Sequence, residues 1–187
     1  MKTTSNTLKA LLFTVLLLTG SHIMAQTTTN PDTVCAGATG EVYLVTNTSG
    51  STYNWTISGG GGTQASGGTT SSITVDWGLT PGLYTNAVSL TETDANGCIG
   101  APMYLDVRII QVGLSALGPF CAGDPAQALV PAPAGGILTG AGVVGGNFDP
   151  TVAGTGTHTI TYDLAGCTTT INVVVNSGPT TGPIQHF

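Results

Sequence analysis

Basic residues are almost absent from this chain, and their absence narrows the class of partner. Only three of its 187 residues are Lys or Arg, against nine Asp or Glu. Lys2 and Lys9 lie near the N-terminus, so Arg108 is the single basic side chain of the remainder. Proteins that bind nucleic acids or anionic membranes need Lys and Arg to neutralise phosphate groups. The composition predicts that neither nucleic acid nor direct membrane insertion is part of the function.

Long apolar runs are also missing. The longest, residues 10–18, is shorter than the ~20 residues that a membrane-spanning helix needs. Lys2 and Lys9 precede it and the small residue Ala25 follows it, which is the pattern of a secretory signal peptide. We therefore predict a signal peptide at residues 1–25 and an extracellular or outer-surface location, with an uncleaved N-terminal anchor as the alternative.

After residue 25 no stripe of apolar residues has the helical period of 3.6. Short segments rich in Thr, Val, Ile and Tyr alternate instead, and Gly, Pro and Asn separate them, which is typical of β-strands joined by turns. The expected strands lie near residues 41–47, 52–58, 72–77, 84–93, 102–110, 126–130, 136–139, 157–163 and 168–175. The chain is predicted to be all-β, with a sandwich or barrel architecture.

Motifs for catalysis and metal binding are lacking as well. The chain has no Cys-x-x-Cys pair, no Gly-x-Ser-x-Gly turn and no paired-histidine zinc motif. His158 lies in an alternating strand, and Asp149 before a proline suits a turn. Asp94 and Asn96 offer too few oxygen ligands for Ca²⁺. We predict a protein that is not an enzyme, with no catalytic residue, no bound metal and no cofactor.

The four cysteines form a duplicated frame. Cys35-Ala-Gly is followed later by Gly-Cys98, and Cys121-Ala-Gly is followed by Gly-Cys167. Four cysteines of an exported protein allow three pairings. Because equivalent positions of repeated modules should pair within each module, the frame favours Cys35–Cys98 and Cys121–Cys167.

This frame predicts two tandem β-sandwich modules with one disulfide each, and the resemblance described below implies that they are immunoglobulin-like. The expected domains are 26–112 and a smaller 113–176, followed by a C-terminal tail at 177–187. Trp55 is expected to point into the first core, as a buried tryptophan does in immunoglobulin-like sandwiches. The glycines of residues 58–68 predict a mobile loop, because glycine favours neither strand nor helix.

Several segments resemble known surface proteins. Residues 121–124, 133–143, 148–150 and 153–162 are similar to the tandem immunoglobulin-like repeats of large adhesins in gliding and biofilm-forming bacteria, which use type IX secretion. The motifs Val34–Gly37, Tyr53–Thr56, Ile73–Gly78 and Ala95–Cys98 resemble the related PKD-like domains. The resemblance implies sandwich modules that act as spacers or adhesive units and carry no catalytic residue.

A few residues are candidates for binding or modification. Trp77, Tyr84 and Tyr104 are candidates for an exposed aromatic platform that binds glycans or proteins. Thr33, in Asp-Thr-Val, resembles the O-glycosylation signal of exported proteins from the same bacterial group. The tail ends in apolar Ile184 and Phe187, which we consider as an assembly tail that docks into a neighbour, against the alternative of a frayed terminus.

Three classes of function stay open at this point. The first is a structural or adhesive surface protein, in its most specific form a subunit of an extracellular filament. The second is a carbohydrate- or protein-binding module, and the third is an accessory domain of an extracellular enzyme system. The expected partners are other surface proteins, further copies of the chain, or glycans.

Overall fold

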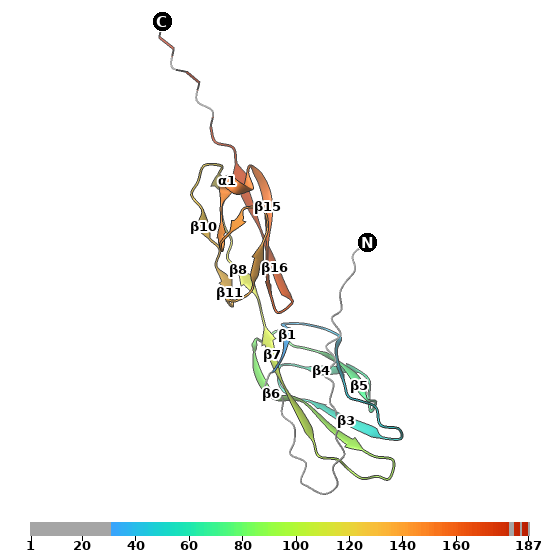
Figure 1. The fold of residues 1–187 in the computed structure, drawn as a ribbon. Helices are drawn as coiled ribbons and strands as arrows, with labels where there is room; N and C mark the ends of the chain where they lie inside the picture. The colour runs from blue at the N-terminus through green and yellow to red at the C-terminus, as the bar shows by residue number, and fades with distance from the viewer. Residues whose placement is uncertain (1–30, 180–181, 184, 187) are drawn as a thin grey trace. The chain divides into compact units, whose positions relative to one another are not determined.

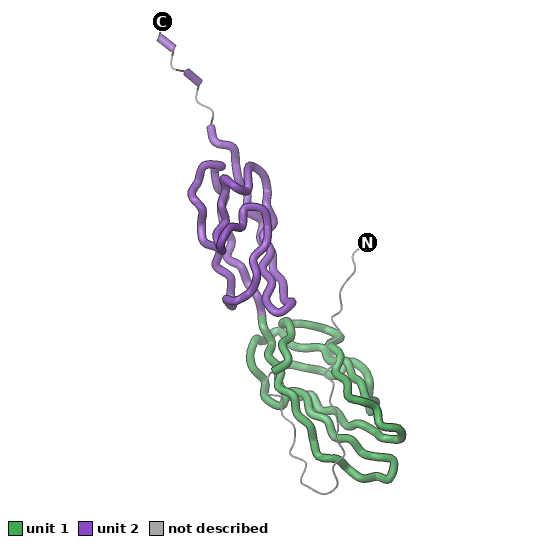
Figure 2. Tube along the Cα trace, viewed as in Figure 1, with its two compact units in different colours: residues 1–110 green, residues 111–187 purple. Residues whose placement is uncertain are grey.

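The computed structural model describes residues 31–179, 182–183 and 185–186. The chain forms two compact units, residues 1–110 and 111–187 (Figures 1 and 2). Each is described by itself below, as unit 1 and unit 2. The predicted signal peptide and the tail residues Ile184 and Phe187 lie outside the described residues.

Unit 1 is a sandwich of two sheets. One sheet has the order β1-β7-β6-β3 and the other β2-β5-β4. The seven strands are β1 (Asp32–Cys35), β2 (Glu41–Leu44), β3 (Thr52–Ile57), β4 (Thr63–Ser66), β5 (Ser72–Asp76), β6 (Gly82–Thr93) and β7 (Met103–Ile110). All pairs are antiparallel except β1 with β7, so the first strand of the unit lies parallel to its last.

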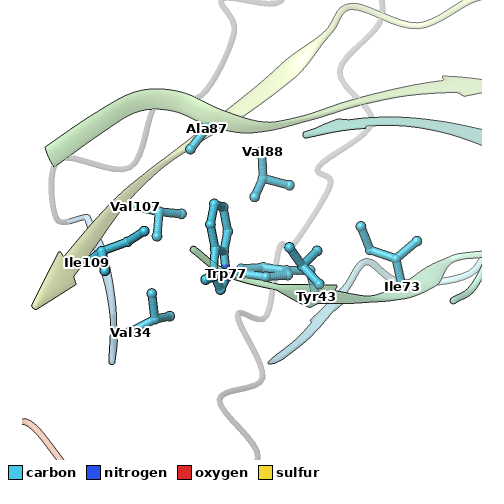
Figure 3. Close-up of a cluster of buried hydrophobic side chains, with 9 residues drawn as sticks. Val34, Tyr43, Ile73, Trp77, Ala87, Val88, Val107 and Ile109 are labelled. Atoms are coloured by element: carbon cyan, nitrogen blue, oxygen red, sulfur yellow. The ribbon is translucent and has the colours of Figure 1, made fainter. Parts of the chain in front are cut away.

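Alternation along the strands builds the core of unit 1. In β5 the side chains of Ile73 and Val75 are buried and the residues on either side are not, as a period of two requires. Figure 3 shows Trp77 among buried side chains of both sheets. The core consists of Val34, Tyr43, Ile73, Val75, Trp77, Ala87, Val88, Val107 and Ile109. Trp55, the tryptophan expected inside, is only partly buried at the edge of this core.

The glycine-rich segment is closely packed, contrary to the expectation of a mobile loop, and it includes strand β4. A Cβ added at Gly62 would lie 2.7 Å from both Ile57 Cγ2 and Trp77 Cζ3. A Cβ added at Gly60 would lie 3.0 Å from Ile109 Cδ1. The glycines are present because the backbone passes directly over the Trp77 ring, where no side chain fits.

We expect Gly62→Ala to lower the free energy of unfolding of unit 1 by about 1–3 kcal/mol, because the added methyl group overpacks the core. Chemical denaturation followed by tryptophan fluorescence measures this change, since both tryptophans lie in unit 1. Gly100→Ala is the matched control, because its nearest neighbour would be Glu92 O at 3.4 Å. Equal stability of the two variants would contradict close packing over Trp77.

Unit 2 contains two larger sheets and a two-stranded ribbon. The sheets have the orders β12-β15-β16-β9 and β10-β14-β13, and the ribbon pairs β11 with β8. The elements are β8 (Gly113–Leu114), β9 (Phe120–Cys121), β10 (Gln127–Ala128), β11 (Pro131–Ala132), β12 (Ile137–Thr139), β13 (Val143–Val144), β14 (Asn147–Phe148), α1 (Pro150–Ala153), β15 (Gly156–Leu164) and β16 (Cys167–Asn176). As in unit 1, the first strand of the four-stranded sheet, β9, lies parallel to the last, β16.

Both larger sheets contribute to the core of unit 2. Its buried cluster consists of Phe120, Leu129, Phe148, Ile160, Val173 and Val175. Buried Tyr162 accepts a hydrogen bond from Gly136 N at 2.9 Å and donates one to Pro133 O. One turn of helix, α1, departs from the expectation of strands alone. Asp149 caps it, accepting hydrogen bonds from Thr151 N and Val152 N.

The all-β, immunoglobulin-like fold class is confirmed. The long strands lie close to their expected positions. The strand expected near residues 126–130 contains β10. The strands that the sequence did not indicate are β1, β4, β8, β9, β11, β13 and β14, which are too short to show a clear alternating pattern.

Candidate functional site

The two cysteines of the Cys-Ala-Gly segments occupy equivalent places in the two units. In unit 1, Cys35 pairs with Ile110 at the end of β7, and Ala36 N donates to Ile110 O at 2.8 Å. In unit 2, Cys121 pairs with Asn176 at the end of β16, and Ala122 N donates to Asn176 O at 2.9 Å. We call this end of each unit, where its last strand finishes, the exit pole.

The two Gly-Cys cysteines also occupy equivalent places. Cys98 ends the turn from Asp94 that precedes β7, and Cys167 follows the two-residue turn between β15 and β16. Both turns need a backbone of positive φ, and Gly97 and Gly166 supply it at 84° each. We call this end of each unit, where its last strand begins, the turn pole.

The strand between the poles separates the two cysteines of each unit. Strand β7 alone has eight residues, and β16 has ten. At ~3.3 Å per residue the poles lie more than ~20 Å apart, whereas a disulfide needs Cα atoms within ~7 Å. The predicted pairings Cys35–Cys98 and Cys121–Cys167 are therefore wrong.

The oxidation states of the cysteines agree with this geometry. Cys35 and Cys167 are disulfide-bonded, whereas Cys98 and Cys121 are exposed and carry free thiols. Of the two exit-pole cysteines, Cys35 is oxidised and Cys121 is free. Of the two turn-pole cysteines, Cys167 is oxidised and Cys98 is free. The duplicated frame correctly indicated which cysteines occupy equivalent positions. The two cysteines of each predicted pair nevertheless lie at opposite poles of their unit.

A carboxylate holds the backbone beside each free thiol. Asp94 Oδ1 accepts hydrogen bonds from Cys98 N and Asn96 N, each at 2.8 Å. Asp124 Oδ2 accepts one from Cys121 N at 2.7 Å. The hydrogen bond from the Cys98 backbone, followed by those from Asn96 and Gly97, lowers the pKa of Asp94 below its ordinary value. Both thiols are therefore presented on ordered turns.

Because the folded pKa of Asp94 is lowered, its carboxylate stabilises the turn above the pKa of the unfolded chain. This contribution is lost as pH falls through the folded pKa. We expect acidification through that range to lower the protection factor of the Cys98 amide, which is its NMR hydrogen-exchange rate corrected for the intrinsic rate at each pH. Asp94→Asn, which keeps an acceptor but does not titrate, should abolish the pH dependence. The same acid response in both proteins would contradict this role of Asp94.

The predicted aromatic platform of Trp77, Tyr84 and Tyr104 is not formed. Trp77 is 4% exposed, and its indole Nε1 donates to Tyr43 OH at 3.1 Å. Tyr84 pairs with core residue Val107, whereas Tyr104 lies three residues from Val107 along β7 and so on the other face of the sheet. The local pattern around Trp77 resembled that of an exposed strand end and gave no sign of burial.

The described residues contain an apolar pocket in unit 1, of about 240 Å³, that the sequence analysis did not predict. It opens between β2 of one sheet and β3, β6 and β7 of the other. Its lining consists of Asp32, Glu41, Val42, Tyr43, Leu44, Val45, Trp55, Val88, Ser89, Leu90, Met103, Tyr104 and Leu105. No sequence pattern marks it, because its walls come from strands that are far apart in the chain.

Two acidic residues, Asp32 and Glu41, accompany this mostly apolar lining. Tyr43 OH donates to Asp32 Oδ2 at 3.0 Å while it accepts the hydrogen bond from Trp77. Burial, and then the charge of Asp32, raise the pKa of Tyr43 well above its ordinary value. The phenol therefore stays protonated and serves as a structural donor rather than as an acid or base.

The polar residues weighed as catalytic or metal-binding candidates have structural roles. His158 Nε2 lies 2.9 Å from Gly154 O, and its ring packs on Phe148 with centroids 6.2 Å apart. Asp149 caps α1 and Asp94 holds its turn. Within residues 31–179 and the described parts of the tail, three or more His, Cys, Asp or Glu residues nowhere gather as a metal site would require. Thr33 lies in β1, and its glycosylation stays a prediction.

Each unit thus has the architecture of an immunoglobulin-like β-sandwich module. Comparison with protein-family models finds a PKD-like domain at residues 21–105, which confirms the PKD-like part of the resemblance. No curated protein matches the chain. Such domains are generally non-catalytic, and together with the disulfide-bonded cysteines they fit an extracellular protein. Among the described residues, no helix has the length and apolarity to cross a membrane.

Proposed function

We propose that this chain is a non-catalytic structural protein of the cell surface, exported through its signal peptide, with an adhesive role. The observation that supports this most directly is the repetition of one module design. Both units place equivalent cysteines at equivalent poles, and each has its own core. Independent modules that repeat one design suit a spacer or an adhesive unit.

Surface chemistry supports the same proposal. With 6% charged residues, the chain offers few sites for electrostatic recognition of nucleic acids or membranes. Thr-rich outward faces, as in β16, keep the strands in solution without charge. A partner would therefore be engaged by backbone pairing, apolar contacts or covalent bonds rather than by charge.

The experiment is deletion of the gene in the native cells, followed by measurement of cell attachment to a solid surface under flow. We expect attachment to fall severalfold and to be restored by the full chain. Trp77→Ala, which removes the centre of the unit 1 core, should fail to restore it. Normal attachment of the deleted strain, or detection of the chain inside the cells rather than on their surface, would overturn the proposal.

A second candidate function rests on the apolar pocket of unit 1. Its lining of Trp55, Leu90, Met103 and Leu105 suits the apolar side chain of a protein partner better than a sugar, which would need more polar groups. Titration with N-acetyl-leucine amide, followed by NMR, should then give saturable shifts at Trp55. Oligosaccharides should give none.

A substitution that fills the pocket tests this candidate. Val45→Phe should abolish the shifts, because Val45 lines the pocket from outside the strands. Val144→Phe, at an exposed position of unit 2, should leave them unchanged. Shifts that do not saturate, or that survive Val45→Phe, would exclude the pocket as a binding site.

A further inference from the structure

The two free thiols occupy poles of different kinds. Cys98 lies at the turn pole of unit 1 and Cys121 at the exit pole of unit 2, and both are exposed. Their equivalents in the other unit are Cys167 and Cys35, the two that are disulfide-bonded. The chain itself therefore shows that a turn-pole cysteine and an exit-pole cysteine are each suited to oxidation.

Exposed apolar side chains accompany both free thiols. Ile99, the next residue after Cys98, is 74% exposed. Val152, on α1, is 62% exposed. Helix α1 lies near the Cys121 pole, because Gly156, three residues after the helix, pairs with Val175, which also pairs with Phe120. A surface that abuts either pole would remove these apolar side chains from water, which favours association.

From these observations we propose that copies of this chain join covalently through a disulfide between Cys121 of one copy and Cys98 of the next. Ile99 and Val152 would pack within the joint. The proposal rests on the proposed structural function and names its partner, a second copy of the chain. Because the joint uses two different surfaces, one copy of a joined pair keeps its Cys98 thiol and the other keeps its Cys121 thiol. Growth therefore continues into open filaments or closes into rings.

The reaction is a thiol–disulfide exchange that needs an oxidant of the dithiol–disulfide class. The Cys121 thiolate attacks one sulfur of the oxidant's disulfide and forms a mixed disulfide with it, releasing one thiolate of the oxidant. The Cys98 thiolate of the second copy then attacks the Cys121 sulfur and releases the oxidant's other sulfur as a thiolate. Two thiols of the protein are oxidised, and one disulfide of the oxidant is reduced to two thiols.

Complementary single variants of the full chain give the sharpest test. Cys98→Ser keeps only the exit-pole thiol, and Cys121→Ser keeps only the turn-pole thiol. Incubated separately with oxidised glutathione and quenched with iodoacetamide, each should stay monomeric on a non-reducing gel. Mixed in equal amounts they should form a dimer and nothing larger, whereas the wild-type chain should form a ladder.

Peptide mapping should find the Cys98–Cys121 linkage in the mixed dimer. Ile99→Ser and Val152→Ser should each slow its formation severalfold, while Val174→Ser, at an exposed site on β16, should not. Tryptophan fluorescence confirms that unit 1 is folded in each variant, and the dispersion of the valine methyl NMR signals confirms the same for unit 2. Three results would overturn the proposal: dimers formed equally well by one variant alone, wild-type thiols consumed without an increase in size, or no reaction of the mixture.

These results also separate this inference from the proposed function. If the cysteine variants restore attachment of the deleted strain as well as the wild-type chain does, the proposal of a covalent joint is wrong. The proposed structural function is then still supported. If the full chain does not restore attachment but the ladder still forms, the surface role fails and self-assembly stands.

Discussion

Trp77→Ala should lower the free energy of unfolding of unit 1 by about 3–5 kcal/mol, the usual cost of removing a large buried aromatic side chain. The ring lies between the two sheets and meets Tyr43 edge to face, with centroids 6.2 Å apart (Figure 3). The substitution also removes the hydrogen bond from Nε1 to Tyr43 OH. Because the glycine segment packs directly on the ring, the loss leaves a cavity that backbone alone cannot fill.

Denaturation of the variant can be followed through the fluorescence of Trp55, which remains in unit 1. Trp55→Phe is the matched control, since Trp55 is only partly buried and its Nε1 donates to Thr70 O at 2.8 Å. The control should cost much less than Trp77→Ala. Similar losses from both substitutions would mean that Trp77 is not the centre of this core.

The strands that could be predicted from the sequence are those long enough to show their alternation. Ser72–Asp76 and residues 157–163 carry β-branched residues on one face at strand length, and the structure contains β5 and β15 at those places. Two-residue strands such as β13 have no period to detect. Their positions depend on tertiary packing against Phe148, which local sequence does not encode.

Burial of the aromatic residues was harder to predict than the strands. Trp77 follows β5 in sequence, and nothing local distinguishes it from an exposed strand end. Its burial depends on Gly60 and Gly62, which let a distant backbone segment cover the ring. A run of glycines near a strand was therefore evidence of close packing, although by composition it resembled a flexible loop.

The internal repeat predicted which cysteines are equivalent but not which cysteines form disulfides. The repeat correctly predicted that Cys35 corresponds to Cys121 and Cys98 to Cys167, because local turns and strand ends follow local sequence. Pairing depends on register across the sheet, and the parallel edge strand places each Cys-Ala-Gly segment at the end of the last strand. The sequence does not show on which edge that first strand pairs, or in which direction.

Phe148→Ala should lower the free energy of unfolding of unit 2 by about 3–5 kcal/mol. Phe148 is fully buried, and its ring lies 5.5 Å from that of Phe120, centroid to centroid. Small domains bury proportionately less apolar surface and have stabilities of only ~5–15 kcal/mol. We therefore expect a substantial unfolded fraction of unit 2 at 37 °C, visible as loss of dispersion in the methyl NMR signals of its valines.

The same variant tests whether the two units unfold separately. Unit 2 contains no tryptophan, so fluorescence reports on unit 1 alone. If each unit depends on its own core, the fluorescence transition of Phe148→Ala stays at its wild-type midpoint while the unit 2 signals are lost early. Val144→Ala, an exposed position in the same unit, should change neither. A fluorescence midpoint that falls together with the unit 2 signals would show that the two cores unfold as one, and modules that depend on each other in this way would be poor spacers.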